Sequence, residues 1–344
     1  NQGRTIVVGN PDQTVEGSVL VLRRKLNSEV TTLEGSSGFN IGPSFSDQWV
    51  SPSVNAGLGH SISLSSTSNT LVAGAPFASA VRTTSTAERP KFFYSTNTAT
   101  ASSLTKQGIV KITSFNTLTN VYDNSYVVSS PVPSNNEEFG YSVATSDTRL
   151  VVGAPGRGSN TGAVYVYNKG TDWDYLEEIL APDHTEGDRF GEQLVASKDL
   201  GILIVSAKKK ETIEQAGDST VKNTGKVFVY YYDGTGYNLI QTIDESLVTS
   251  LSNTDLLGSS LGISDNGDTL VIGAPLTDGV EVDQGAVHVF ERQTQNDSTT
   301  GYAFKETILS PSIQNGENFG HRIAVNPNGT SFAVSSAIGS NDKL

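Results

Sequence analysis

Short apolar runs recur along this chain, and polar turns rich in glycine and proline separate them. One clear unit begins with an alternating run at residues 141–144, continues at 150–152, and adds further runs at 163–167 and 173–180. Runs of four to eight residues with a period of two are typical of β-strands. Helical periodicity is weak, and only residues 183–192 could hold a helical turn. The pattern predicts an all-β chain made of units with four short antiparallel strands.

Two motifs recur in the same order in each unit. A Phe-Gly or Leu-Gly pair opens the first strand, and its glycines are Gly59, Gly140, Gly191, Gly258 and Gly320. A turn of small residues ends the second strand. It reads Gly-Ala-Pro at Gly74 to Pro76, Gly153 to Pro155 and Gly273 to Pro275, and serine replaces the glycine at Ser206 and Ser335. Self-similarity of this kind indicates a modular array, and the usual closed array of such β units is a β-propeller.

The repeats also predict how the chain is divided. We expect a single β-propeller domain, or a section of one, over residues 1–344. The expected blades are a partial blade at 1–57, full blades at about 58–138, 139–189, 190–256 and 257–318, and a partial blade at 319–344. Because the two partial blades together hold more strands than one blade, the sequence favours a longer natural chain with six or seven blades.

The Phe-Gly pairs, the Gly-Ala-Pro turns and third strands such as residues 162–167 resemble the FG-GAP repeat of integrin α-subunit-like β-propellers. The resemblance implies four-stranded blades in which the pair and the turn pack together on one face. It also implies an extracellular or cell-surface location. Calcium-binding members carry several carboxylates between the first two strands of a blade. Here only Asp265-Asn266-Gly267-Asp268 looks similar, and it is short enough to be a plain hairpin turn, so we expect no metal site.

Composition narrows the possible partners. The chain has 23 Lys and Arg against 36 Asp and Glu, a net charge of −13, which argues against nucleic acid. Cysteine is absent, which excludes disulfides, thiolate metal sites and cysteine nucleophiles. No run approaches the ~18 apolar residues of a membrane span, so we expect no direct membrane insertion. We expect no cofactor.

Candidate binding residues lie at two kinds of position. The residue directly after each Phe-Gly or Leu-Gly pair should face one end of a central channel; these residues are His60, Tyr141, Glu192, Ser259 and His321. The long loops after second strands hold Arg82, Tyr94 and Lys208. Long loops on a rigid scaffold often carry binding sites, although they can equally cover neighbouring blades. The run at residues 208–210 is interpreted as solvated charge.

The sequence contains no HExxH, GxSxG, P-loop or dinucleotide motif, and we assign no catalytic residue. The leading hypothesis is a non-enzymatic extracellular interaction or structural module of a larger surface, adhesion or appendage protein. Its loops would meet protein or glycan at the cell surface, copies of itself or other subunits. The alternatives are a polysaccharide lyase or hydrolase, which would want a cluster of Tyr, His, Arg and Lys, and a lectin. The aromatic residues that repeat, such as Tyr165 and Phe228, lie on third strands, where core packing explains them.

Overall fold

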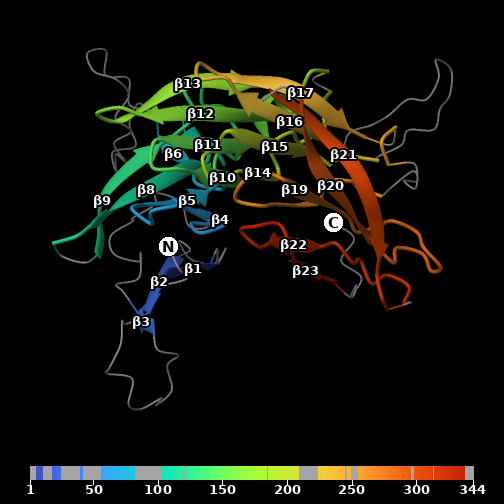
Figure 1. Ribbon diagram of the computed structural model, residues 1–344. Helices are drawn as coiled ribbons and strands as arrows, with labels where there is room; N and C mark the ends of the chain where they lie inside the picture. Colours follow the sequence, from blue (N-terminus) through green and yellow to red (C-terminus); the bar gives the residue numbers. More distant parts are fainter. Residues whose placement is uncertain are drawn as a thin grey trace. The chain divides into compact units, whose positions relative to one another are not determined.

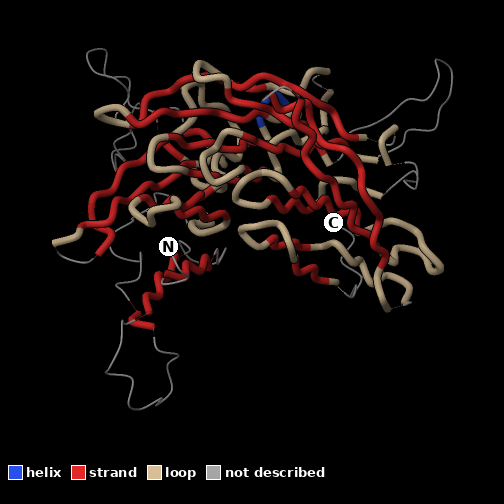
Figure 2. The backbone as a smooth tube through the Cα atoms, viewed as in Figure 1, coloured by secondary structure: helices blue, strands red, loops and turns tan. Residues whose placement is uncertain are grey.

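The computed structural model describes residues 5–10, 18–24, 39–41, 56–81, 103–118, 121–183, 185–208, 224–244, 246–248, 255–295, 298–312 and 314–337. Strands dominate this part of the chain (Figure 2). The one helical element within these ranges is α1 (Arg157–Asn160), a single turn with left-handed backbone angles at Gly158 and Ser159. The described residues among 183–192 form turns and no helix, so that sequence expectation is wrong. The prediction of an all-β chain is confirmed.

The chain forms two compact units, which are described separately: residues 1–157 with 165–175, and residues 158–164 with 176–344. Unit 1 holds a three-stranded sheet, a four-stranded sheet and a small hairpin (Figure 1). Their strands are β1 (Thr5–Asn10), β2 (Ser18–Arg24) and β3 (Phe39–Ile41); β4 (Ser61–Leu64), β5 (Thr70–Ala75), β8 (Ile109–Asn116) and β9 (Val121–Val128); and β6 (Ala80–Val81) with β7 (Ser103–Leu104).

Unit 2 holds two four-stranded sheets and a two-stranded sheet. Their strands are β14 (Leu194–Ala196), β15 (Ile202–Ala207), β16 (Lys226–Tyr232) and β17 (Tyr237–Ile243); β18 (Ser260–Ile263), β19 (Thr269–Ala274), β20 (Ala286–Gln295) and β21 (Ser298–Leu309); and β22 (Arg322–Val325) with β23 (Phe332–Ser335). One more sheet contributes residues to both units: β10 (Ser142–Thr145), β11 (Arg149–Ala154), β12 (Ala163–Lys169) and β13 (Trp173–Ile179).

The four-stranded sheets follow one design. Their strands are hydrogen-bonded in chain order, and the strand pairs are antiparallel. Every residue of β5 and β15, the second strands of their sheets, is buried, so both faces of these strands are covered. This confirms the predicted fold class, a β-propeller of four-stranded antiparallel blades, because such a blade buries both faces only when it packs between its neighbours.

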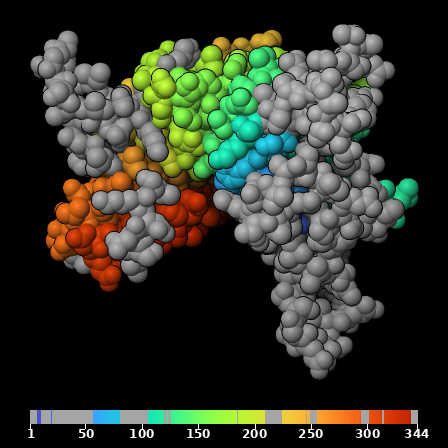
Figure 3. All heavy atoms as spheres, turned by 180° about the vertical axis from the view of Figure 1, so that it is seen from behind, coloured from blue at the N-terminus to red at the C-terminus, as the bar shows by residue number. Residues whose placement is uncertain are grey.

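The hydrophobic cores lie between successive sheets within each unit. In unit 2, Ile204 of β15 and Val229 of β16 share one cluster with Leu270 and Ile272 of β19. Ile323 and Phe332 of the last sheet pack against a second cluster on β19 and β20. In the space-filling view from behind, red atoms of the last sheet abut orange atoms of the sheet before it (Figure 3). Burying an aliphatic or aromatic side chain of this size contributes about 1.5–3 kcal/mol, so these interfaces hold the blades together.

The phenylalanines of two Phe-Gly pairs, Phe139 and Phe190, pack on the third strand of their own sheets. Phe139 is fully buried, and its ring centroid lies 5.6 Å from that of Tyr165 and 6.2 Å from that of Tyr167. In unit 2, Phe190 packs in the same way on Phe228, at 5.5 Å. The repeated third-strand aromatics therefore belong to the core, as the sequence indicated.

The glycines join the pair to the small-residue turn, both within a blade and between blades. The backbone N–H of Gly140 donates to the carbonyl of Gly153 in its own sheet, at 3.0 Å. The carbonyl of Gly140 covers Gly74 of the preceding sheet so closely that a Cβ on Gly74 would lie 1.9 Å from it. Gly140 itself has φ +90°, which L side chains rarely adopt. Glycine is therefore required on both sides of this contact, which explains why the two motifs recur together.

A repeated hydrogen bond holds the hairpin between the first and second strands of a blade in place. A tyrosine of the fourth strand donates its hydroxyl proton to a carbonyl at the hairpin tip. The pairs are Tyr122 to Ser68 (2.6 Å), Tyr237 to Leu200 (2.7 Å) and Tyr302 to Gly267 (2.6 Å). The accepting residue has positive φ in each case. The outer strand of a blade thereby fixes its inner hairpin.

Candidate functional site

Buried carboxylates lie two residues before the Phe-Gly or Leu-Gly pair in four repeats: Glu137, Asp188, Asp255 and Glu317. Glu137 accepts hydrogen bonds from the backbone N–H of Ser134 (2.9 Å) and the hydroxyl of Tyr165 (2.8 Å). The hydroxyl of Tyr165 in turn accepts a bond from Nε of Arg157 (2.9 Å). Burial raises the pKa of Glu137, and these partners oppose the rise. In unit 2, Asp188 likewise accepts from the N–H of Thr185, so these acids stabilise the turn that leads into each pair.

The residue before each pair has a left-handed backbone. The φ angles are +69° at Gly57, +58° at Glu138, +56° at Arg189, +54° at Leu256 and +52° at Asn318. For non-glycine residues this conformation costs about 1–2 kcal/mol. Glu137 and Glu138 therefore lie in the turn that leads into the pair. The turn sets the path of the backbone through the pair, and so the direction in which the next side chain leaves it.

In unit 1, the structure brings together two of the residues that follow the pairs, His60 and Tyr141. Nδ1 of His60 lies 3.1 Å from the backbone carbonyl oxygen of Tyr141, and the two ring centroids are 4.4 Å apart. The imidazole also meets Phe77 edge to face, at 5.6 Å. Arg82 and Tyr94, the other candidates in this half of the chain, lie outside the described residues.

In unit 2, Glu192 stands at the centre of a group of charges. Its Oε1 lies 2.7 Å from Nζ of Lys208, and its Oε2 lies 2.8 Å from Nε of Arg189. The Glu192 side chain is only 5% exposed, and each cation is 17% exposed. Burial alone would raise the pKa of Glu192, but Lys208 and Arg189 outweigh burial and hold it below its usual value. Lys208 is thus a paired, largely buried cation, and its interpretation as solvated charge is wrong.

The remaining candidates of unit 2 differ from one another. His321 is partly buried, and burial together with the positive charges of Arg322 and Lys208 lowers its pKa. The hydroxyl of Ser259 donates to the carbonyl of Leu256 (2.8 Å) and so braces its own turn. Sequence reasoning singled out Glu192, Lys208 and His321 and missed Arg189, which directly precedes its Phe-Gly pair.

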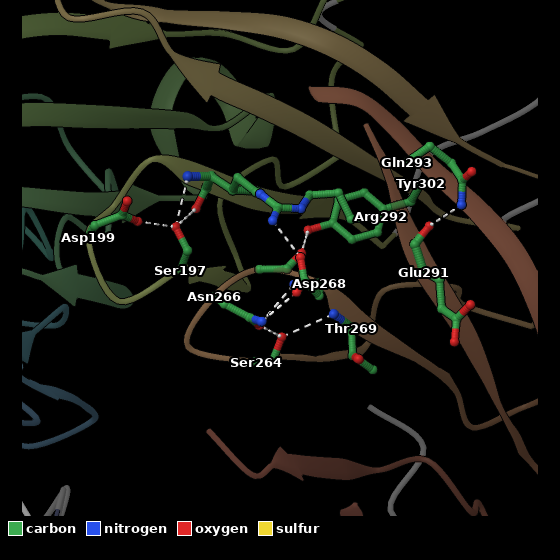
Figure 4. A network of polar contacts seen from close by, with 12 residues as sticks. Ser197, Asp199, Ser264, Asn266, Asp268, Thr269, Glu291, Arg292, Gln293 and Tyr302 are labelled. Carbon is green, nitrogen blue, oxygen red and sulfur yellow. Dashed lines mark hydrogen bonds and ion pairs between the residues drawn. The ribbon is translucent and has the colours of Figure 1, made fainter. Parts of the chain in front are cut away.

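The calcium-like segment forms the hairpin between β18 and β19 (Figure 4). Asn266 bridges Ser264 and Asp268, and the guanidinium of Arg292 pairs with Asp268. Asp265 pairs with Lys198 at 3.1 Å. Calcium binding needs six to eight oxygen ligands, whereas both carboxylates here face cations. Within the described ranges, no three or more His, Asp or Glu side chains gather as a metal-binding group.

Comparisons with known proteins agree with the repeat. A family model described as FG-GAP repeat matches residues 131–167, which run from the connection after β9 into β12. The chain therefore carries an FG-GAP repeat in this segment, which confirms the resemblance predicted from its motifs. No curated protein matches the chain.

Among solved structures, the chain is similar to the periplasmic gluconolactonase PpgL of Pseudomonas aeruginosa. The TM-score is 0.41 and the sequence identity is 12%, over 96% of this chain and 88% of that chain. A likeness this distant carries no argument about what the chain does. In the part of the chain described, no helix is long and apolar enough to cross a membrane.

Proposed function

We propose that this chain is a non-enzymatic interaction module of an extracellular or cell-surface protein, and that its loops bind a protein partner. The FG-GAP repeat supports this proposal, as does the way the blades are built. Apolar clusters between successive sheets and backbone contacts at the glycines hold the scaffold together, while the side chains after the pairs differ from blade to blade. Such a scaffold is stable whatever chemistry its loops carry.

The observation that carries the proposal is the loop between β19 and β20. Val280 and Val282 are 74% and 56% exposed on this loop. The buried side chain of Gln284 holds the loop in place, because its Oε1 accepts from the N–H of Val280 (3.0 Å) and its Nε2 donates to the carbonyl of Ser310 (3.1 Å). The two exposed valines on this fastened loop support its assignment as the contact surface.

The same loop favours protein over glycan. Valine side chains cannot hydrogen-bond to sugar hydroxyls, but they can enter an apolar pocket of a protein. The N–H of Asp283 donates to the carboxylate of Asp278 (2.9 Å), and the N–H of Gly316 donates to the carbonyl of Val282 (3.0 Å). Because the loop is already ordered by these bonds, binding through it would cost little conformational entropy.

An array of purified secreted proteins, surface proteins and glycans tests this function. The chain should bind a protein on the array, and the double variant Val280→Ser/Val282→Ser should bind it at least tenfold more weakly. The matched control is Val132→Ser, which changes a valine that is 59% exposed in unit 1 and should bind normally. In parallel, the chain is incubated with polysaccharides and sugar lactones. Turnover of any of them, or partner binding that the double variant leaves intact, would refute the proposal.

A further inference from the structure

The loop between β19 and β20 carries negative charge around its two exposed valines. Residues 276–285 include no lysine, arginine or histidine, and their three acids are Asp278, Glu281 and Asp283. Val280 and Val282 alternate with these acids along the chain, and Glu281, between the two valines, is exposed as well. The apolar surface of this loop is therefore displayed among carboxylates.

These charges are not neutralised within the described residues. None of the three carboxylates pairs with a cation there, whereas another acid of unit 2, Asp265, pairs with Lys198. Burial and the charge of Asp278 both raise the pKa of Asp283, and no positive charge among its described neighbours opposes that rise. The repulsion between the two aspartates therefore stays unrelieved in the described chain.

The fold keeps the repelling acids close together. Oδ1 of Asp278 accepts a hydrogen bond from the backbone N–H of Asp283. The N–H of Gly279 donates to the carbonyl of Glu281 (3.1 Å), and the N–H of Asn318 donates to the carbonyl of Asp283 (3.0 Å). Because these bonds fix the backbone of the loop, the two aspartates cannot separate. A cation supplied by a partner would relieve their repulsion.

A basic protein surface satisfies both features of the loop. A wholly apolar pocket would bury the valines, but it would strip water from the neighbouring carboxylates without replacing the lost hydrogen bonds. Nucleic acids, acidic glycans and acidic proteins would add like charge. A metal ion would make no use of the valines, and the described part of the chain gathers no group of three or more metal-binding side chains. Lysine or arginine beside apolar side chains matches both the charge and the valines.

We propose that the loop between β19 and β20 binds a basic protein, on which Lys or Arg side chains border the apolar pocket that takes Val280 and Val282. This proposal rests on the proposed function and names the chemistry of its partner. The buried valines supply affinity, while the carboxylates speed the encounter and reject partners of the wrong charge.

The test uses a display library of a small helical-bundle domain in which the surface residues of two helices are randomised. The full wild-type chain selects binders at low salt, and domains that also bind the double variant Val280→Ser/Val282→Ser are discarded. The remaining domains should carry more Lys and Arg than Asp and Glu at the randomised positions, next to Leu, Ile or Phe. Their dissociation constants are then measured with purified variants of the chain.

The double variant Asp278→Asn/Glu281→Gln removes two charges from the loop and keeps the Oδ1 acceptor at residue 278. It should bind the selected domains at least tenfold more weakly at low salt, and the loss should shrink at high salt. The matched control is Asp172→Asn/Glu186→Gln, which removes two exposed charges from other turns of the chain and should bind like the wild type. Circular dichroism and thermal melting confirm that each variant is folded.

Three results from the library would overturn the proposal: selected domains that are neutral or acidic, no domain whose binding depends on the two valines, or equal binding by the two charge variants. The array of the preceding section separates this proposal from the proposed function. Array binding that depends on Val280 and Val282 but is unchanged in Asp278→Asn/Glu281→Gln would overturn the basic partner and leave the proposed function standing.

Discussion

His288 is a buried imidazole that the fold keeps neutral, and it should make the protein less stable in acid. It lies in β20 with no exposed surface, and its Nδ1 is 2.9 Å from the hydroxyl of Thr307. Its Nε2 meets no hydrogen-bonding partner within the described residues. Burial lowers the pKa of His288 from 6.5 to about 4. A proton on this ring would place a charge between β19 and β21, where Ile272 and Thr307 are its cross-strand neighbours.

The cost follows from the two pKa values. Between pH 6.5 and about pH 4 the unfolded chain binds a proton at this histidine, and the folded chain does not. The free energy of unfolding therefore falls as the pH drops through this window, and His288 causes no further loss below it. The gap between the two pKa values corresponds to about 3 kcal/mol at 25 °C. That is a large part of the 5–15 kcal/mol that typically stabilises a folded domain.

The substitution His288→Phe isolates this effect, because Phe228 occupies the equivalent position of β16. Urea unfolding of both proteins from about pH 7.5 to pH 4 gives the difference in their free energies of unfolding. The variant should gain about 3 kcal/mol relative to the wild type across this range. Acids such as Glu192 titrate in both proteins and cancel. His321→Gln, at a partly exposed histidine, should gain less. A difference that does not change with pH, or an NMR titration midpoint of His288 near 6.5, would refute the reasoning.

Two further predictions concern the scaffold. Gly74→Ala should lower the free energy of unfolding by about 3 kcal/mol or more, because its Cβ would lie 1.9 Å from the carbonyl oxygen of Gly140. Gly316→Ala should lower it by only about 1 kcal/mol, because Gly316 has a positive φ but no atom lies within 4 Å of its Cβ. Equal losses in urea unfolding would contradict the proposed contact. Tyr167→Phe should lower the free energy of unfolding by about 1–2 kcal/mol, since the hydroxyl of Tyr167 donates to the carbonyl of Ser129 (2.8 Å). Tyr230→Phe should be neutral or stabilising, because the buried hydroxyl of Tyr230 has no partner among the described residues. Thermal melting of the two variants in parallel tests this difference, and an equal drop in melting temperature for both would contradict it.

The sequence predicted the repeat because glycine leaves a strong signal where backbones touch. Gly74 and Gly140 are fixed by a contact that admits no side chain. The glycine of the pair recurs in five repeats, and the glycine of the small-residue turn recurs in three of them. The buried acids, such as Glu137 and Asp188, left a signal as well, since an acid precedes the pair by two residues in four repeats. That signal was overlooked because a carboxylate in a turn suggests solvent, and only the structure shows the groups that it binds.

The charge group around Glu192 was predictable only in part. The position after the pair identified Glu192 and His321, because equivalent positions of a repeat meet in space. Arg189 escaped notice because the position before the pair holds Gly57, Leu256 or other unrelated residues elsewhere, so the sequence shows no pattern there. Lys208 looked like one of three solvated lysines. Its ion pair joins the residue after β15 to a residue before β14, and no property of the local sequence distinguishes Lys208 from its neighbours.

The contacts between the two repeated motifs differ from blade to blade. Ser206 makes the point. It stands where other repeats have the glycine of Gly-Ala-Pro. A Cβ on Gly258 would lie 2.9 Å from the Cβ of Ser206. This joint between blades therefore accommodates a small side chain, whereas the joint between Gly74 and Gly140 accommodates none. The residue after each pair is under less constraint still, which is why a histidine beside an aromatic ring and a glutamate between two cations can occupy the same repeat position. A binding site in such a chain is therefore assembled from residues of several blades, and the candidates for it are the repeat positions whose residues differ between blades.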